Sequence, residues 1–132
     1  MKDAISILRQ SGIQPTPQRI AVIEYVLQSK AHPSAEEVLN YARKKCPTVS
    51  RATVYNTLNL LVEKGLLRVQ TIREGATVFD ANIEKHHHFI DKDTGEIVDI
   101  PWDYLEVKEK EKFRDFEILD YQVIIHGRRK KK

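Results

Sequence analysis

Three consecutive histidines and a later aspartate are the residues of this sequence best suited to bind a metal ion. Alternate residues of a β-strand share a face, so His86 and His88 would point to one side and His87 to the other. A hairpin turn centred on residues 93 and 94 would place residue 88 opposite Asp99, with the carboxylate on the same face. Two imidazoles and a carboxylate suit Fe(II) and neighbouring metals. An exposed polar strand is the alternative interpretation.

Further metal ligands must come from histidine, aspartate or glutamate, because the 132-residue chain has a single cysteine, Cys46. One cysteine can form neither an internal disulfide nor a cysteine-based zinc cluster. His32, in a short loop, and Asp80, at the end of a predicted strand, could complete the coordination sphere. In isolation, a loop histidine or a strand-end aspartate is usually only solvated.

Local signals predict that helices dominate the first half of the chain. A short helix ends at Gly12, and Thr16 followed by Pro17 begins the second helix. Residues 34–37 form a capping box at the start of a third helix, and Ser50 caps a fourth. Strands at residues 67–72 and 76–79 then flank a short glycine-containing turn. This order predicts a winged helix-turn-helix domain.

The whole chain is therefore expected to have an α+β fold in two parts. An N-terminal winged helix-turn-helix domain (residues 1–80) is followed by a polar hinge (81–85), a small α/β dimerisation domain (86–127) and a basic tail (128–132). Because a domain of this size has little core, pairing with a second copy would bury its surface. The expected C-terminal elements are strands at 86–90 and 96–100, a charged helix at about 103–115, and a last strand in which Leu119, Tyr121, Val123 and Ile125 alternate.

The exposed face of the fourth predicted helix carries residues suited to contact DNA. In a helix-turn-helix, the second helix lies in the major groove and its N-terminal half contacts bases and phosphates. Arg51 can contact phosphate or guanine, Asn56 an adenine edge, and Tyr55 a thymine methyl group. A solvent-facing helix, or a winged helix that binds protein, is the alternative. The residues expected to contact double-stranded DNA are Arg19, Ser50, Arg51, Thr53, Tyr55, Asn56 and Asn59.

Charge and composition agree with a nucleic-acid-binding globular protein. Hydrophobic residues make up 41% and charged residues 31% of the chain, which excludes collagen-like and wholly disordered classes. Residues 1–80 carry 11 basic and 7 acidic side chains, whereas residues 81–127 carry 6 and 12. A basic first half indicates a polyanionic partner. No apolar run approaches the roughly 20 residues of a membrane span, and no signal-peptide core is evident, so we expect a cytoplasmic protein without a membrane partner.

Several motifs occur together along the chain: Thr16-Pro17-Gln18-Arg19, Ala31-His32-Pro33-Ser34-Ala35-Glu36-Glu37, Ser50-Arg51-Ala52-Thr53-Val54-Tyr55-Asn56, Phe79-Asp80, His86-His87-His88 and Gly95-Glu96-Ile97-Val98-Asp99. With these motifs the chain resembles the ferric uptake regulator family, and most closely its peroxide-responsive branch. The resemblance implies a homodimeric, metal-dependent transcriptional repressor of a palindromic operator. It places one regulatory metal, Fe(II) or Mn(II) with Zn(II) also possible, on His32, Asp80, His86, His88 and Asp99.

Two residues are similar to the peroxide branch in particular, because iron-uptake members usually carry Glu at the position of Asp99 and Arg at that of Asn56. The resemblance then implies that bound Fe(II) reacts with hydrogen peroxide and oxidises His32 and His86, so that operator DNA is released. Redox-inert Zn(II) would not support this reaction. A repressor of the same fold that senses iron, manganese or zinc abundance, and ignores peroxide, is the first alternative.

The sequence also departs from the family pattern. Most members hold a structural zinc on two Cys-x-x-Cys pairs, whose positions here carry Asp91 and Thr94, and Arg128 and Lys131. We therefore expect no structural zinc and a dimer that relies on apolar packing. Tyr121 stands where many members have a second-site histidine, which argues against a second regulatory metal.

An enzyme is the third interpretation, because a histidine and carboxylate site could serve an Fe(II) oxygenase or a metal hydrolase. Five protein ligands would leave little room for a substrate, and no segment suggests a lid or a second acid/base pair. We therefore expect that the protein is not an enzyme.

Overall fold

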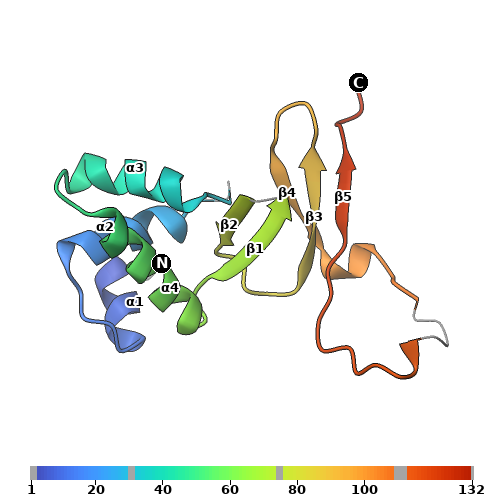
Figure 1. Ribbon diagram of the computed structural model, residues 1–132, viewed down its shortest axis with the longest axis horizontal. Helices are drawn as coiled ribbons and strands as arrows, with labels where there is room; N and C mark the ends of the chain where they lie inside the picture. Colours follow the sequence, from blue (N-terminus) through green and yellow to red (C-terminus); the bar gives the residue numbers. More distant parts are fainter. Residues whose placement is uncertain (1–2, 30–31, 74–75, 109–112, 132) are drawn as a thin grey trace. The chain divides into compact units, whose positions relative to one another are not determined.

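The computed structural model describes residues 3–29, 32–73, 76–108 and 113–131 (Figure 1). The chain divides into two compact units, Met1–Ile83 and Glu84–Lys132. The predicted α+β class is confirmed: within the described residues, the first unit has four α-helices and a two-stranded sheet, and the second has a three-stranded sheet. Among the described helices, none has the length and apolar character needed to cross a bilayer.

The N-terminal unit has the element order of a winged helix-turn-helix. Its helices begin where the side-chain caps predict: Thr16 accepts a hydrogen bond from the Arg19 amide, and Ser50 accepts one from the Thr53 amide. Ser34 and Glu37 form the predicted capping box. The elements are α1 (Ala4–Gln10), α2 (Pro17–Val26), α3 (Ala35–Lys45), α4 (Arg51–Glu63), β1 (Arg68–Arg73) and β2 (Ala76–Asp80).

A single apolar core holds these helices together. Val54, Leu58 and Leu61 form the buried face of α4, as the spacing predicts, whereas Val62 is only partly buried. Leu8 and Leu39 bring α1 and α3 into the same cluster. The opposite face of α4 is consequently left exposed, and its side chains can contact a ligand.

The C-terminal unit is built on a three-stranded sheet with the order β4-β3-β5. The central strand, β3 (His86–Asp91), pairs antiparallel with β4 (Ile97–Pro101) and parallel with β5 (Ile124–Gly127). His88 lies opposite Asp99, which confirms the predicted hairpin register. The turn is closed by the Asp91 carboxylate, whose Oδ1 accepts hydrogen bonds from the amides of Asp93 and Thr94.

The predicted charged helix is wrong over the residues that can be compared. A 3-10 helix, η1 (Trp102–Tyr104), follows β4, and residues 105–108 are not helical; residues 109–112 lie outside the described part. A charged α-helix of the predicted length is stable only if it buries an apolar face against another part of the protein. In the single chain, Tyr104, Val107 and Phe113 are exposed instead.

The last strand also begins later than predicted, at Ile124 rather than near Leu119. The parallel register pairs Ile124 with His88, so residue 122 would lie opposite His86, the first residue of β3. Residues before 122 therefore have no β3 residue with which to pair, and they run as irregular chain.

Candidate functional site

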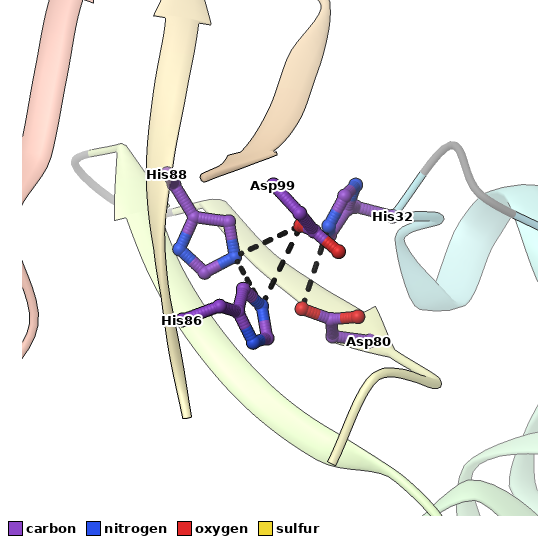
Figure 2. A group of neighbouring side chains, drawn as sticks. All are labelled: His32, Asp80, His86, His88 and Asp99. Atoms are coloured by element: carbon purple, nitrogen blue, oxygen red, sulfur yellow. Dashed lines mark hydrogen bonds and ion pairs between the residues drawn. The ribbon is translucent and has the colours of Figure 1, made fainter. Parts of the chain in front are cut away.

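Three predicted metal ligands converge within the C-terminal unit. His86 and His88 project from one face of β3, and their Nε2 atoms lie 3.0 Å apart. Asp99 projects from β4, and its Oδ1 lies 3.5 Å from each of these nitrogens. Both imidazoles are buried, and the Asp99 side chain is about two-thirds buried (Figure 2). We call these residues the ligand trio.

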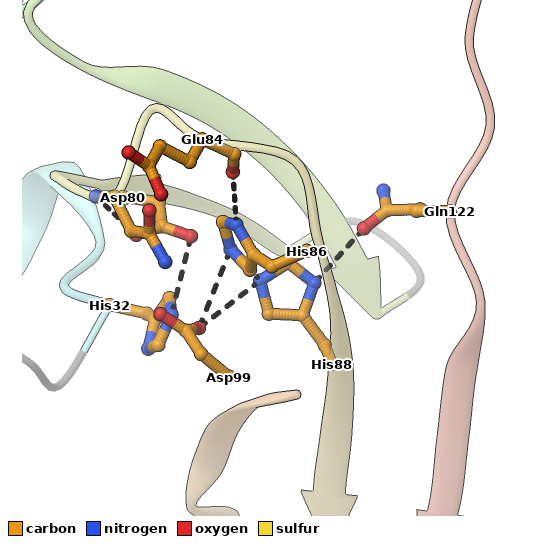
Figure 3. Close-up of polar contacts among 8 residues, drawn as sticks. His32, Asp80, Glu84, His86, His88, Asp99 and Gln122 are labelled. Atoms are coloured by element: carbon orange, nitrogen blue, oxygen red, sulfur yellow. Dashed lines mark hydrogen bonds and ion pairs between the residues drawn. The ribbon is translucent and has the colours of Figure 1, made fainter. Parts of the chain in front are cut away.

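Hydrogen bonds fix the tautomers of both histidines of the trio (Figure 3). His86 Nδ1 lies 2.6 Å from the Glu84 carbonyl oxygen, and His88 Nδ1 lies 3.0 Å from Gln122 Oε1. A carbonyl oxygen can only accept, so each Nδ1 carries the proton and donates it. In the neutral rings, each Nε2 then carries a lone pair that is directed at the other histidine of the trio.

This arrangement fits a bound cation. Two lone pairs 3.0 Å apart repel one another unless a positive charge lies between them. Two ligands bonded at about 2.1 Å to one ion, and separated by about 90–110°, would be roughly 3.0–3.4 Å apart. The distances within the trio match that range closely, and nitrogen with carboxylate donors suits Fe(II), Mn(II) and Zn(II).

His32 and Asp80 form a second group within the N-terminal unit. His32 Nε2 lies 3.4 Å from Asp80 Oδ2, and both side chains are buried. The Phe79 amide donates to the Pro33 carbonyl over 2.9 Å, which fastens the loop that carries His32 to β2. His32 has a backbone φ of 54°, a left-handed conformation that costs a non-glycine residue roughly 1–3 kcal/mol. Strain of this kind persists where the surroundings impose it, often at functional sites.

His87 differs from its neighbours, as the strand pattern predicts. The Val123 amide donates to its Nδ1 over 3.0 Å, so the proton of the neutral ring is on Nε2. The ring is buried and stacks on Trp102, with 4.4 Å between centroids. His87 is therefore a packing residue of the sheet, and the histidine triplet contains two different tautomers.

Gln122, Glu84 and Trp102 support the histidines, and sequence reasoning missed all three. Gln122 is 34 residues from His88, and no spacing rule connects them. The Glu84 contact uses a backbone carbonyl, which every residue has. The Gln122 contact becomes visible only once β3 and the segment before β5 lie side by side.

The residues expected to contact DNA lie mainly on the exposed face of α4. Arg51, Tyr55, Asn56 and Asn59 are exposed there. Arg19 of α2, with Asn56 and Asn59, lines a shallow surface depression, to which Thr53 also contributes. Ser50 and Thr53 are in addition engaged in the helix cap, since their hydroxyl groups lie 2.8 Å apart.

Arg51 already has an ionic partner within the N-terminal unit. Its guanidinium pairs with the carboxylate of Glu36 at the start of α3, and both side chains are about half exposed. An incoming phosphate would therefore compete with Glu36 for the same positive charge.

Three of the four positions where a structural zinc would need cysteines, those of Asp91, Thr94 and Arg128, hold side chains with other partners. Backbone amides, chiefly that of Asp93, lower the pKa of Asp91 below its ordinary value and keep it ionised in the turn. The Thr94 hydroxyl oxygen accepts a hydrogen bond from the Glu96 amide over 3.1 Å, and Arg128 pairs with Asp93. No thiolate is available at these positions, so they do not fit a structural zinc of the cysteine type.

Comparison with known proteins gives consistent matches. A sequence model of the ferric uptake regulator family matches residues 10–126. The peroxide-responsive repressor PerR of Staphylococcus aureus (strain Mu50) is 33% identical over 129 residues, 96% of this chain and 87% of that protein. The ferric uptake regulator of Pseudomonas aeruginosa, solved with manganese, has a TM-score of 0.70 at 29% identity and covers 98% of this chain and 100% of its own. The Campylobacter jejuni peroxide stress regulator has a TM-score of 0.63 at 26% identity, covering 96% and 93%.

Proposed function

Because this chain belongs to the ferric uptake regulator family, we propose that it is a metal-dependent transcriptional repressor and that hydrogen peroxide is its signal. The observation that carries the metal dependence is the ligand trio, in which the Nε2 atoms of two buried imidazoles lie 3.0 Å apart and each lies 3.5 Å from the same carboxylate oxygen. Relatives with this fold are named as regulators and repressors, so we infer a regulator rather than an enzyme.

We propose that one Fe(II) or Mn(II) ion is bound by the trio together with His32 and Asp80. The N-terminal unit supplies a buried imidazole and carboxylate, and the C-terminal unit supplies the other three donors. Ligands drawn from both units would stabilise only the relative orientation in which all five converge. Metal occupancy would in this way set the position of the recognition helix, α4. The cysteine positions described above lead us to propose no structural zinc.

We further propose that the protein acts as a homodimer on a palindromic operator. The C-terminal unit exposes large apolar side chains, among them Tyr104, Phe116 and Leu119, with exposed fractions of 73%, 68% and 81%. A second copy could bury this surface without cysteine-bound zinc. Two copies related by a twofold axis would then present two α4 helices to successive major grooves.

For the signal, we propose His32 and His86 as the residues that peroxide oxidises when Fe(II) is bound. Fe(II) would supply the electron for reductive cleavage of peroxide next to the imidazoles. His86 is held in its ligand tautomer by the Glu84 carbonyl, and His32 is the only histidine of the proposed set in the N-terminal unit. Loss of either imidazole as a ligand would remove the coupling between the two units.

The direct test is a DNA-binding titration. An operator duplex is first selected from random sequences by the Mn(II)-loaded protein, and binding is then followed by fluorescence anisotropy with and without Mn(II). We expect tight binding only with the metal. Failure to select any duplex, or equal affinity without metal, would contradict the proposal.

The ion pair between Glu36 and Arg51 predicts that Glu36 weakens DNA binding. The variant Glu36→Gln frees Arg51 for a phosphate, and an exposed pair of this kind is worth about 0.2–1 kcal/mol, so affinity should rise about 1.5- to 5-fold. Glu24→Gln, at an exposed position of α2, makes the same change in net charge and is the matched control. Weaker DNA binding by Glu36→Gln than by Glu24→Gln would contradict this prediction and would mean that Glu36 orients Arg51 within the DNA complex.

A further inference from the structure

We propose that Gln122 is a positioning residue of the metal centre, which holds His88 in the tautomer that can bind the ion. The inference rests on the proposed metal-binding function of the ligand trio and adds a residue to it. The observation is the 3.0 Å contact between Gln122 Oε1 and His88 Nδ1 (Figure 3).

Backbone contacts of the next residue hold Gln122 in place. The His88 amide donates to the Val123 carbonyl over 3.1 Å, and the Val123 amide donates to His87 Nδ1 over 3.0 Å. Both bonds connect the segment before β5 to the histidine triplet. The side chain of Gln122 therefore reaches His88 from a fixed point of the backbone, although Gln122 itself lies at the surface.

The contact matters because a neutral imidazole carries one proton on one of its two nitrogens. If Nε2 of His88 carried the proton, this nitrogen would have no lone pair to donate to a metal ion. An oxygen acceptor at Nδ1 favours the other tautomer, fixes the orientation of the ring and raises the basicity of Nε2. Removing such a partner typically lowers metal affinity 10- to 100-fold.

The two histidines of the trio differ in how this support is supplied. His86 uses the Glu84 carbonyl, which a side-chain substitution does not remove, whereas His88 depends on the side chain at position 122. A single residue outside the five proposed ligands can thus adjust how tightly the trio holds its ion. A substitution at position 122 can change the affinity for the ion while the ligands stay the same.

The test compares Gln122→Leu, which removes the acceptor, with Gln122→Glu, which keeps an acceptor and adds a charge. Gln28→Leu, at an exposed position of the N-terminal unit, is the matched control. Mn(II) affinity of the full chain is measured from the free-ion signal in electron paramagnetic resonance. The His88 tautomer of the metal-free protein is read from long-range ¹H–¹⁵N spectra. If Gln122 had a purely structural role, its substitution would leave this tautomer unchanged.

We expect Gln122→Leu to raise the Mn(II) dissociation constant about 10- to 100-fold and to shift His88 toward the Nε2-protonated tautomer. Gln122→Glu should keep the wild-type tautomer and bind Mn(II) at least as tightly as the wild type. Wild-type affinity and tautomer in Gln122→Leu would overturn the inference. If the wild-type protein fails to bind Mn(II), the proposed function fails, while the tautomer of the metal-free protein still tests the role of Gln122.

Discussion

Replacing His88 with alanine should abolish metal-dependent DNA binding. His88 is fully buried, and its Nε2 lies within 3.5 Å of both other members of the trio. The substitution leaves one imidazole and one carboxylate in the trio. Loss of a direct ligand should exceed the 10- to 100-fold effect of losing an outer partner, so we expect Mn(II) affinity to fall by at least about 100-fold. Calorimetric Mn(II) titration and anisotropy with the selected duplex measure the two losses.

The exposed histidine of β5, His126, provides the matched control, and His126→Ala should behave as the wild type in both measurements. Because His88→Ala removes a buried ring, circular dichroism must show that the variant remains folded. Asp99→Asn is a second variant that keeps the shape of its side chain and loses its charge, and it should also weaken Mn(II) binding. Wild-type Mn(II) affinity in a folded His88→Ala protein would exclude the trio as the metal site.

Peroxide should release the Fe(II) form from DNA and leave the Mn(II) form bound. In the Fe(II) form, mass spectrometry should find one added oxygen atom on His32 or His86. The reason is proximity, because reactive species formed at the ion attack the nearest imidazoles before they diffuse away. The Mn(II) form has the same proposed ligands and binds the same DNA. It therefore distinguishes oxidation that depends on Fe(II) from general oxidative damage.

His87 and His126 are internal controls for this experiment, since neither belongs to the proposed ligand set. Oxidation spread equally over all five histidines would indicate non-specific damage. An Fe(II) form that stays on DNA with unmodified His32 and His86, while a positive control is oxidised, would favour the alternative repressor, which senses metal abundance alone. In that case the trio keeps its role and only the signal changes.

Predictions that rest on neighbouring residues are confirmed. The caps at Thr16, Ser34 and Ser50 act within three residues of themselves, so the sequence contains their whole physical cause. The pairing of His88 with Asp99 likewise follows from the length of one hairpin turn. The trio, three of the five proposed ligands, could therefore be predicted from local pattern.

Predictions that depend on distant partners fail or need the family resemblance. The charged segment after Pro101 has helical spacing, but a helix there depends on a surface against which to pack. The start of β5 is set by where β3 begins, which the alternation of apolar residues does not show. His32 and Asp80 are each unremarkable alone, and only the Phe79–Pro33 contact explains why they meet.

The junction at residues 122–123 connects the histidine triplet, with the proposed ligand His88, to the segment that carries the exposed apolar side chains. If pairing of two copies orders that segment, then metal uptake and self-association are thermodynamically linked, and each must strengthen the other by the same factor. The apparent affinity for the ion would then rise with protein concentration. A cell could thus change its sensitivity to the ion simply by making more of the regulator.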